Sequence, residues 1–179
     1  MVPIVTALIF VAATLGFAAL AYYKIKAADK IVYAAGSALN VQLSFRREII
    51  KNLSASASSA ARENTDMASI LEKLKTEPAA DFKISVRAAQ EKTVSSSLSD
   101  LFKLAAGVPA LKDNSGFNSY QKSLFKCEEK ISQAAAFYNG AVRDYNTLLA
   151  VFPVSLAAKM FDYAPADIFI FEESNPGTK

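Results

Sequence analysis

Few residues of this chain could carry out chemistry. It has no His, which removes the commonest general base and a common metal ligand. Two adjacent carboxylate pairs stand out, Glu128-Glu129 and Glu172-Glu173, but adjacent helical residues point about 100° apart, so neither pair can flank one substrate. The sequence also lacks a phosphate-binding glycine loop, a nucleophile elbow and metal-ligand spacing. We therefore predict that the protein is not an enzyme and uses no cofactor and no metal.

The one cysteine, Cys127, lies among apolar residues at helical spacing. A thiol in such a stripe is expected to be a buried structural residue rather than a nucleophile. A single cysteine also excludes an internal disulfide and is typical of a reducing compartment.

Polar residues embedded in apolar stripes are more informative. The dipeptide Tyr138-Asn139 recurs seven residues later as Tyr145-Asn146, so both pairs lie on one side of a helix. We expect a polar layer that fixes the register between helices, and a ligand-binding polar pocket is the alternative. Its expected members are Asn40, Gln42, Arg46, Glu128, Asn139, Arg143 and Asn146. A buried guanidinium needs a carboxylate, so Arg46 is predicted to pair with Glu128 or Asp144.

Residues 2–23 contain no charged side chain. As a helix this run is about 33 Å long, which is enough to cross a hydrocarbon core of about 30 Å. The aromatic and basic residues that follow, Tyr22, Tyr23, Lys24 and Lys26, are typical membrane-interface anchors. We predict a retained transmembrane helix. A cleaved signal peptide, or a helix buried in a core or in an oligomer, remains an alternative.

The basic residues beyond this run set the expected orientation. By the positive-inside rule, the lysines at 24, 26 and 30 place the following domain in the cytoplasm and the N-terminus outside. The expected location is a bacterial inner membrane, crossed once. The whole chain has 20 basic and 17 acidic residues and a net charge of +3. These charges are well mixed, so no nucleic-acid partner is predicted.

The apolar periodicity predicts the elements that position these residues. A heptad written from Leu43 continues to Leu74, so the first helix is expected to run from the membrane to 74–76. A second helix is predicted at 79–106 and a third at 117–152, with Tyr138, Tyr145 and Leu148 in the core. Pro153 separates a short helix at 154–161, and the alternating residues 167–173 suggest an extended tail.

The predicted fold class is therefore all-α. An N-terminal transmembrane helix continues into an antiparallel bundle of three long helices plus a short C-terminal helix. The expected divisions are an anchor at 1–26, the bundle at 27–173 and a polar tail at 174–179.

Three segments carry a family resemblance, of which the last, at the C-terminal end, comprises Ala157 to Phe161 and the closing Phe171-Glu172. LNVQL at 39–43, the basic pair at 46–47 and EIIKNL at 48–53 resemble the "IDVQL, basic pair, D-L-I-P-N-L" segment of the LemA family. The run Y-N-x₅-Y-N-T-x₄-F-P at 138–153 is similar to the third-helix signature of that family. The chain departs from the family pattern at Asn40, Lys51, Ser155 and Asp162. The resemblance implies a bacterial envelope protein with a membrane helix and a cytoplasmic antiparallel bundle, and it implies no activity.

We expect a membrane-anchored scaffold or self-assembly protein that organises a membrane or its partners. The lipid bilayer, through residues 2–23, and further copies of the chain are the expected partners. The leading alternative is a regulatory adaptor that binds another membrane protein, such as a protease or sensor kinase. An enzyme that uses carboxylates alone would need two convergent acids in a cleft.

Overall fold

The computed structural model describes residues 2–62, 64–75 and 84–174; near the N-terminus, the side chains at 2, 3, 7, 8, 10 and 11 are not described. The described residues fold into helices connected by turns, without a β-strand, so the predicted all-α bundle is confirmed. The helices are α1 (Val2–Ala61), α2 (Thr65–Lys75), α3 (Ile84–Ala105), α4 (Pro109–Lys112), α5 (Ser115–Ala150) and α6 (Val154–Met160).

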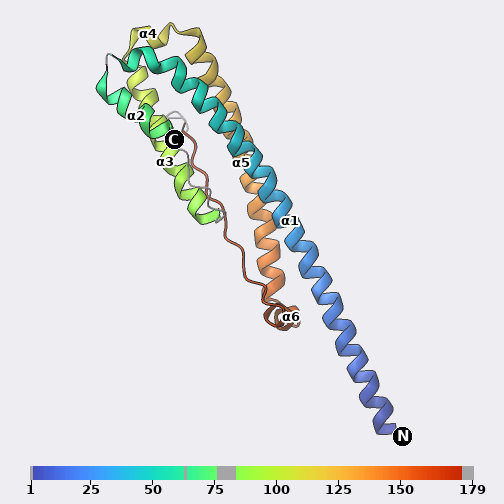
Figure 1. Ribbon diagram of the computed structural model, residues 1–179. Helices are drawn as coiled ribbons and strands as arrows, with labels where there is room; N and C mark the ends of the chain where they lie inside the picture. The colour runs from blue at the N-terminus through green and yellow to red at the C-terminus, as the bar shows by residue number, and fades with distance from the viewer. Residues whose placement is uncertain (1, 63, 76–83, 175–179) are drawn as a thin grey trace.

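An antiparallel pair of long helices forms the frame of the bundle (Figure 1). α1 has 60 residues and is therefore about 90 Å long. Its buried stripe, which includes Leu39, Leu43 and Leu53, packs against Leu124 and Ile131 of α5 in one core. α3 lies along the other side of the bundle, next to α2 and α4 (Figure 1).

The first helix is shorter than the heptad pattern predicts. α1 ends at Ala61, and the chain reverses direction before α2 begins at Thr65. The Asn64 side chain caps the new helix, with its Oδ1 accepting from the backbone N–H groups of Asp66 and Met67 at 3.0 and 3.1 Å. The prediction of one helix to Leu74 is wrong because Met67 and Leu71 pack back onto the core that α1 already uses, which preserves the apolar spacing across the turn.

The other predicted helices are present with shifted ends. α3 covers Ile84–Ala105, and the predicted helix start at 79–83 lies outside the described residues. α5 begins two residues earlier than predicted, because Asn114 Oδ1 accepts from the N–H of Phe117 at 3.0 Å and caps it.

The buried side of α5 differs from the predicted one at most of the second heptad positions, although Cys127 is buried as predicted. The residues at 117, 124, 131, 138 and 145 are buried as expected, so Tyr138 and Tyr145 belong to the core. Their buried neighbours follow four residues later, at 128, 135, 142 and 149, rather than three. Leu148 is therefore only half-buried, and Leu149 takes the core position. This rotation turns the flank carrying Glu128 toward the tail of the chain, which the heptad did not include.

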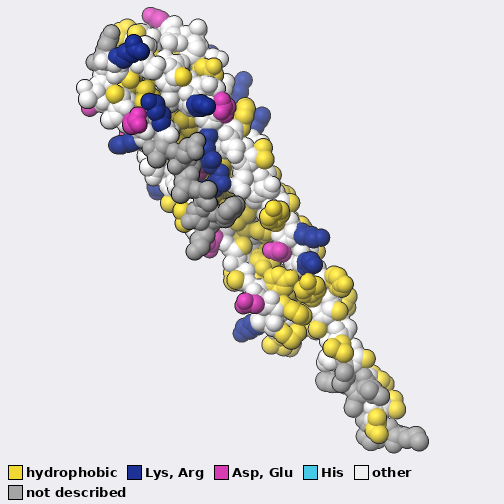
Figure 2. Space-filling view, viewed as in Figure 1, with side chains coloured by type: hydrophobic (Ala, Val, Ile, Leu, Met, Phe, Trp, Pro, Cys, Tyr) yellow, Lys and Arg dark blue, Asp and Glu magenta, His cyan; other side chains and the backbone are white. Residues whose placement is uncertain are grey.

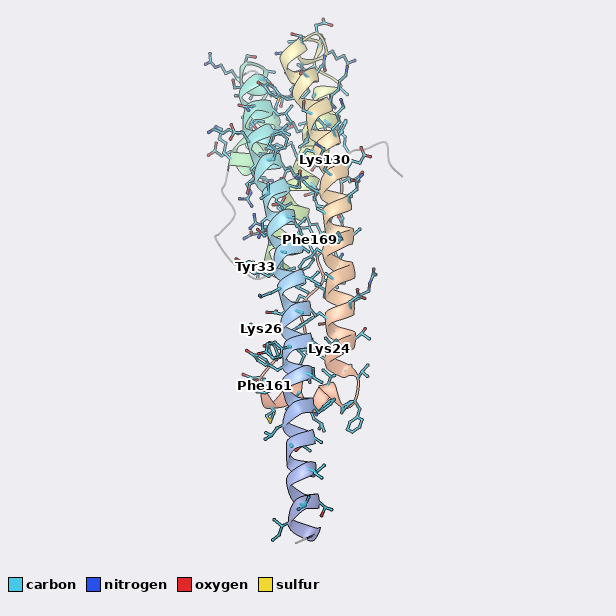
Figure 3. The ribbon with its side chains drawn as sticks, turned by 90° about the vertical axis from the view of Figure 1, so that its right-hand side faces the viewer. Lys24, Lys26, Tyr33, Lys130, Phe161 and Phe169 are labelled. Atoms are coloured by element: carbon cyan, nitrogen blue, oxygen red, sulfur yellow. The ribbon has the colours of Figure 1, made fainter. Side chains whose placement is uncertain are left out.

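Residues 163–174 form an extended tail that runs back along α5, between α5 and α3 (Figure 1). Successive side chains of an extended segment point to opposite sides. Phe169 is buried in the core between α1 and α5 (Figure 3), whereas Ile168 and Ile170 are exposed. The predicted extended tail is thus present, and it is a structural part of the bundle.

The N-terminal part of α1 extends beyond the rest of the bundle (Figure 1). Ile4, Val5, Ile9 and Leu15 are exposed there. A search of the described residues for a helix with the length and apolar character needed to cross a membrane found none.

Candidate functional site

A buried ion cluster at the centre of the bundle joins α1, α3, α5 and the tail. Its centre is Arg46 of α1, whose side chain is fully buried. Arg46 Nη1 donates to Glu91 Oε2 of α3 at 2.7 Å, and Nε and Nη2 donate to Glu128 Oε1 of α5 at 3.2 and 2.7 Å. Nη2 also donates to Ser95 Oγ at 2.8 Å. The expected pairing with Glu128 is present, while Asp144, the alternative partner, is exposed.

The charges of this cluster balance. Glu91 is buried and also lies 3.7 Å from Arg47 Nη2, so two arginines face two glutamates. Arg87 of α3 lies at the edge of the cluster, where burial and the charge of Arg47 lower the pKa of its guanidinium. Charges taken out of water need such compensation, because an unpaired buried ion costs several kcal/mol, on the order of 3–5.

The last described residues of the tail complete the cluster. Ser174 donates from its backbone N–H to Glu128 Oε2 at 3.0 Å and from its hydroxyl to Glu128 Oε1 at 2.8 Å. Ser95 of α3 donates to the carbonyl oxygen of Glu172 at 2.6 Å. The Arg46 guanidinium lies 5.0 Å from the ring centre of Phe171, a cation–π contact. The tail is therefore fixed to both α3 and α5 at this level.

The two Asn side chains of the repeated dipeptide hold the backbone of the tail. Asn139 donates from Nδ2 to the Phe169 carbonyl and accepts from the Phe169 N–H, both at 2.8 Å. Asn146 makes the same pair of hydrogen bonds to Ala166, both at 2.9 Å. Each amide thus satisfies both polar groups of one tail residue, as a neighbouring strand would.

The tyrosines of the two dipeptides also bind the tail, at positions three residues apart as the asparagines do. Tyr138 donates its hydroxyl to the Asp167 carbonyl at 2.9 Å, and Tyr145 donates to the Ala164 carbonyl at 3.2 Å. Burial raises the pKa of both phenols, so they remain donors at neutral pH. Seven helical residues advance about 10.5 Å, and three extended residues about 10 Å. The spacing of the dipeptides therefore matches the repeat of an extended chain.

The predicted polar network is only partly one unit. Arg46 and Glu128 meet, while Asn139 and Asn146 bind the tail rather than α1. Arg143, like its neighbour Asp144, is exposed and lies outside the network.

The other two predicted polar positions of α1, Asn40 and Gln42, lie outside the ion cluster. Gln42 is half-buried, and its backbone carbonyl lies 3.8 Å from the Cys127 thiol. The Asn40 side-chain oxygen is buried without a hydrogen-bond partner among the described residues.

Sequence reasoning missed Glu91, Ser95 and Ser174. Glu91 lies on the core side of α3. Its spacing in the sequence, three residues before Val94 and seven before Leu98, is the one signal that could have placed it on the apolar stripe of that helix. Ser174 carried no such signal.

The expected interface anchors lie where α1 leaves the bundle. The Tyr22 ring packs edge-on against Phe161 of the C-terminal segment, with 5.1 Å between ring centres, and Lys26 Nζ lies 5.5 Å from the same Tyr22 ring. Tyr23 and Lys24 are exposed. Figure 3 shows Phe161 close to the level of Lys24 and Lys26 on α1.

α1 carries a second apolar stripe, which is exposed to solvent. Its members are spaced alternately three and four residues apart, and Lys24 is its one charged member. The stripe consists of Phe17, Leu20, Lys24, Ala27, Ile31, Ala34, Ala38, Val41 and Phe45, all exposed. This spacing is that of a coiled-coil seam, and we call these residues the outer stripe of α1.

A cavity of about 780 Å³ lies between α1, α2 and α3. Its lining mixes small apolar residues with Arg47, Lys51, Glu48 and Glu91. The described residues contain no group of carboxylates and thiol that could hold a metal ion. Cys127 is buried, and burial raises the pKa of its thiol although the Arg46 charge opposes this. The two buried carboxylates that converge in the ion cluster, Glu91 and Glu128, are both ion-paired with Arg46, so this arrangement holds structure.

A comparison with protein-family models matches residues 35–178 to the model described as the LemA family. The matched region begins within the packed part of α1 and includes the ion cluster and both Tyr-Asn pairs. A comparison with curated proteins found no match.

Proposed function

The chain belongs to the LemA family, and from this premise we propose that it is a membrane-attached helical scaffold that assembles with copies of itself. In this proposal the apolar run at 2–23 inserts into the bacterial inner membrane and crosses it once, with the N-terminus outside. The bundle then lies in the cytoplasm, where it organises the membrane or proteins bound to it.

Membrane attachment is supported by the first part of α1. The run from 2 to 23 has no charge, and its exposed members include Ile4, Val5, Ile9 and Leu15. Exposed apolar side chains gathered on one segment of a protein mark a site that contacts a membrane or another molecule. The residues that follow it are Lys24 and Lys26, which favour the side of the membrane with the anionic headgroups.

Self-assembly is supported by one observation above all, the outer stripe of α1. Val41 is 62% exposed and Phe45 is 55% exposed, although both follow the heptad spacing that coiled coils bury. Two copies anchored in one bilayer have parallel α1 helices, so the same residues of the two stripes meet. A second copy of this chain is therefore the occupant that best fits the stripe.

Cysteine crosslinking in vesicles tests the self-assembly. Val41→Cys and Phe45→Cys should each form a disulfide-linked dimer under mild oxidation, because equivalent stripe residues face one another in a parallel pair. Phe137→Cys, an exposed position on α5, is the matched control and should remain monomeric. Cys127 is buried and stays in place in all three variants. Equal crosslinking at the three positions would contradict a specific seam.

The oligomeric mass separates the proposal from its alternative. Native mass measurement of the full chain in lipid nanodiscs should give a multimer, and Val41→Glu with Phe45→Glu should shift it toward the monomer. A monomeric unsubstituted chain would contradict self-assembly and would favour an adaptor that offers the same stripe to another membrane protein.

Carbonate extraction tests the attachment itself. Deleting residues 2–17 removes apolar surface that lies outside the buried core and keeps Ala21, which packs against α6. The full chain should pellet with membranes and the deletion variant should be released. Pelleting of both would contradict anchoring through this segment.

A further inference from the structure

The end of the bundle next to the N-terminal segment carries a second exposed apolar surface. It is formed by the α5–α6 turn, α6 and the residue after α6: Val151, Phe152, Leu156, Met160 and Phe161. Phe152 is 75% exposed, Met160 65% and Leu156 61%. In Figure 2, apolar side chains gather at this end of the molecule and continue along α1, while most charged side chains lie toward the other end. We call these five residues the α6 apolar surface.

The position of this surface relative to α1 is fixed by packing. Ala157 and Ala158 form the inward face of α6 and are buried against Ala21 and Ile25 of α1. The Tyr22 and Phe161 rings are 5.1 Å apart. α6 therefore packs on α1 where the charge-free run ends, with its inward face covered and its outward face bare.

The direction of α6 also suits a flat surface. Figures 1 and 3 show α6 lying across the end of α5 rather than along it. If α1 enters a bilayer along its normal, a helix in this direction lies near the membrane plane. Interfacial helices adopt that direction and bury their apolar face about 5–10 Å into the boundary between headgroups and acyl chains.

The length of α1 beyond α6 determines how close α6 comes to the membrane. Residues 2–17, the part of α1 beyond α6, reach about 24 Å, which is less than a hydrocarbon core of about 30 Å. The charge-free run fills that thickness only if residues near Ala21 and Tyr22 also reach the acyl boundary. Because α6 packs on these residues, inserting the run brings α6 to the same boundary.

The charges around the surface fit an anionic membrane. Lys24, Lys26 and Lys30 of α1, Arg143 of α5 and Lys159 of α6 lie at this end, and the acidic residues among them are Asp29, Asp144 and Asp162. The local balance is positive, and an anionic membrane surface attracts basic residues that lie near it.

We propose that the α6 apolar surface docks on the anionic membrane surface beside the emerging α1, so that the bundle is held to the bilayer at two points. This inference rests on the proposed insertion of residues 2–23. The second contact would fix the tilt of the bundle relative to the membrane, which a single helix does not.

Tryptophan fluorescence tests the docking, because the chain contains no Trp and each substitution gives a single reporter. The full chain is reconstituted into vesicles of phosphatidylglycerol and phosphatidylcholine with brominated acyl chains, which quench Trp on contact. Phe152→Trp and Leu156→Trp report the α6 apolar surface. Leu15→Trp reports the inserted segment, because Leu15 is exposed and lies outside the outer stripe of α1. Phe137→Trp, which is exposed on α5 at 64%, is the matched control. Circular dichroism checks folding, and Met160→Trp replaces a variant that fails to fold.

We expect roughly twofold or greater loss of emission for the reporters at 15, 152 and 156, because an interfacial helix enters the acyl boundary, and no loss at 137. Quenching at 15 without quenching at 152 and 156 overturns the docking and leaves the proposed anchor intact. A blue-shifted but unquenched reporter at 152 or 156 shows coverage by protein, such as a second copy, and also overturns it. Absence of quenching at 15 overturns the proposed insertion itself.

Discussion

The side chain of Arg46 has an unusual set of partners. It is fully buried in α1, yet it donates to two carboxylates and a hydroxyl from two other helices. A planar guanidinium suits such a site because its donors point in fixed, divergent directions. One side chain thereby sets the mutual positions of α1, α3 and α5, which is a matter of register rather than of net stability.

Arg46→Met should lower the free energy of unfolding by about 3–5 kcal/mol, because it leaves Glu128 buried without a cation and Glu91 with only the more distant Arg47. Arg47→Met is the matched control. The Arg47 side chain is 39% exposed and 3.7 Å from Glu91, so its loss should cost less than about 1 kcal/mol. Urea denaturation of both variants measures the difference, and equal costs would contradict the assigned burial.

A double-mutant cycle should then show coupling. Arg46→Met combined with Glu128→Leu should lower the free energy of unfolding by less than the sum of the two single effects, by about 0.5–3 kcal/mol. The reason is that each single variant leaves one buried charge without its partner, whereas the double variant removes both charges of this pair. Additive effects would mean that the two side chains do not interact.

The Cys127 thiol should be inert in the folded protein. Burial raises the pKa of this thiol, and only the thiolate is nucleophilic. A raised pKa leaves less thiolate at a given pH, so alkylation by iodoacetamide should be slow at pH 8 and should accelerate only at higher pH. The same protein in concentrated urea should react at the rate of a free thiol. Equal rates in the two states would show that the thiol is accessible.

The elements differ in how far the sequence predicts them. The apolar repeat of α5 continues to Pro153, and its helix follows from that pattern alone. The reversal after Ala61 was hidden because Met67 and Leu71 return to the same core and so continue the heptad of α1. The tail contacts were hidden for a different reason: Asn139 and Asn146 bind backbone groups, which carry no side-chain signal. The seven-residue repeat of Tyr-Asn is visible in the sequence, but a polar layer that fixes the register between helices accounts for it as well as binding of the tail does.

Asn139→Ala should loosen the tail. It removes both hydrogen bonds to Phe169 and leaves a backbone N–H and carbonyl without partners, at a cost of about 1–3 kcal/mol. Arg143→Ala, exposed on the same helix, should change the free energy of unfolding by less than about 0.5 kcal/mol. Hydrogen exchange at the Phe169 amide reports the contact directly. Unchanged protection of that amide in Asn139→Ala would contradict the role of Asn139 in holding the tail.

The whole molecule has two distinct ends. Exposed apolar side chains lie along the first part of α1 and on α6, and most charged side chains lie toward the opposite end (Figure 2). The family signature at 138–153 contributes to neither exposed surface except at its last residues, because its Tyr-Asn pairs hold the tail inside the bundle. The most recognisable part of the sequence therefore builds the architecture, while the outer stripe of α1 and the α6 apolar surface are left to meet lipid or other copies.

The tail should hold α3 on the frame. Among the described residues, the helices whose backbones adjoin α3 are α2 and α4. At one end α3 packs Phe102 against Phe117 and Phe125 of α5. Toward its other end the tail links it to α5, by Ser95 to Glu172 and Ser174 to Glu128.

Truncation after Tyr163 should therefore reduce the hydrogen-exchange protection of α3 while α1 and α5 stay protected, because their shared apolar core remains. Truncation after Ser174 is the control, since it keeps every contact described for the tail, and it should leave α3 unchanged. If the shorter chain lost protection in all three helices together, the bundle would be one cooperative unit. If it lost none, α3 would be held without the tail. Either result would contradict the role assigned to these residues.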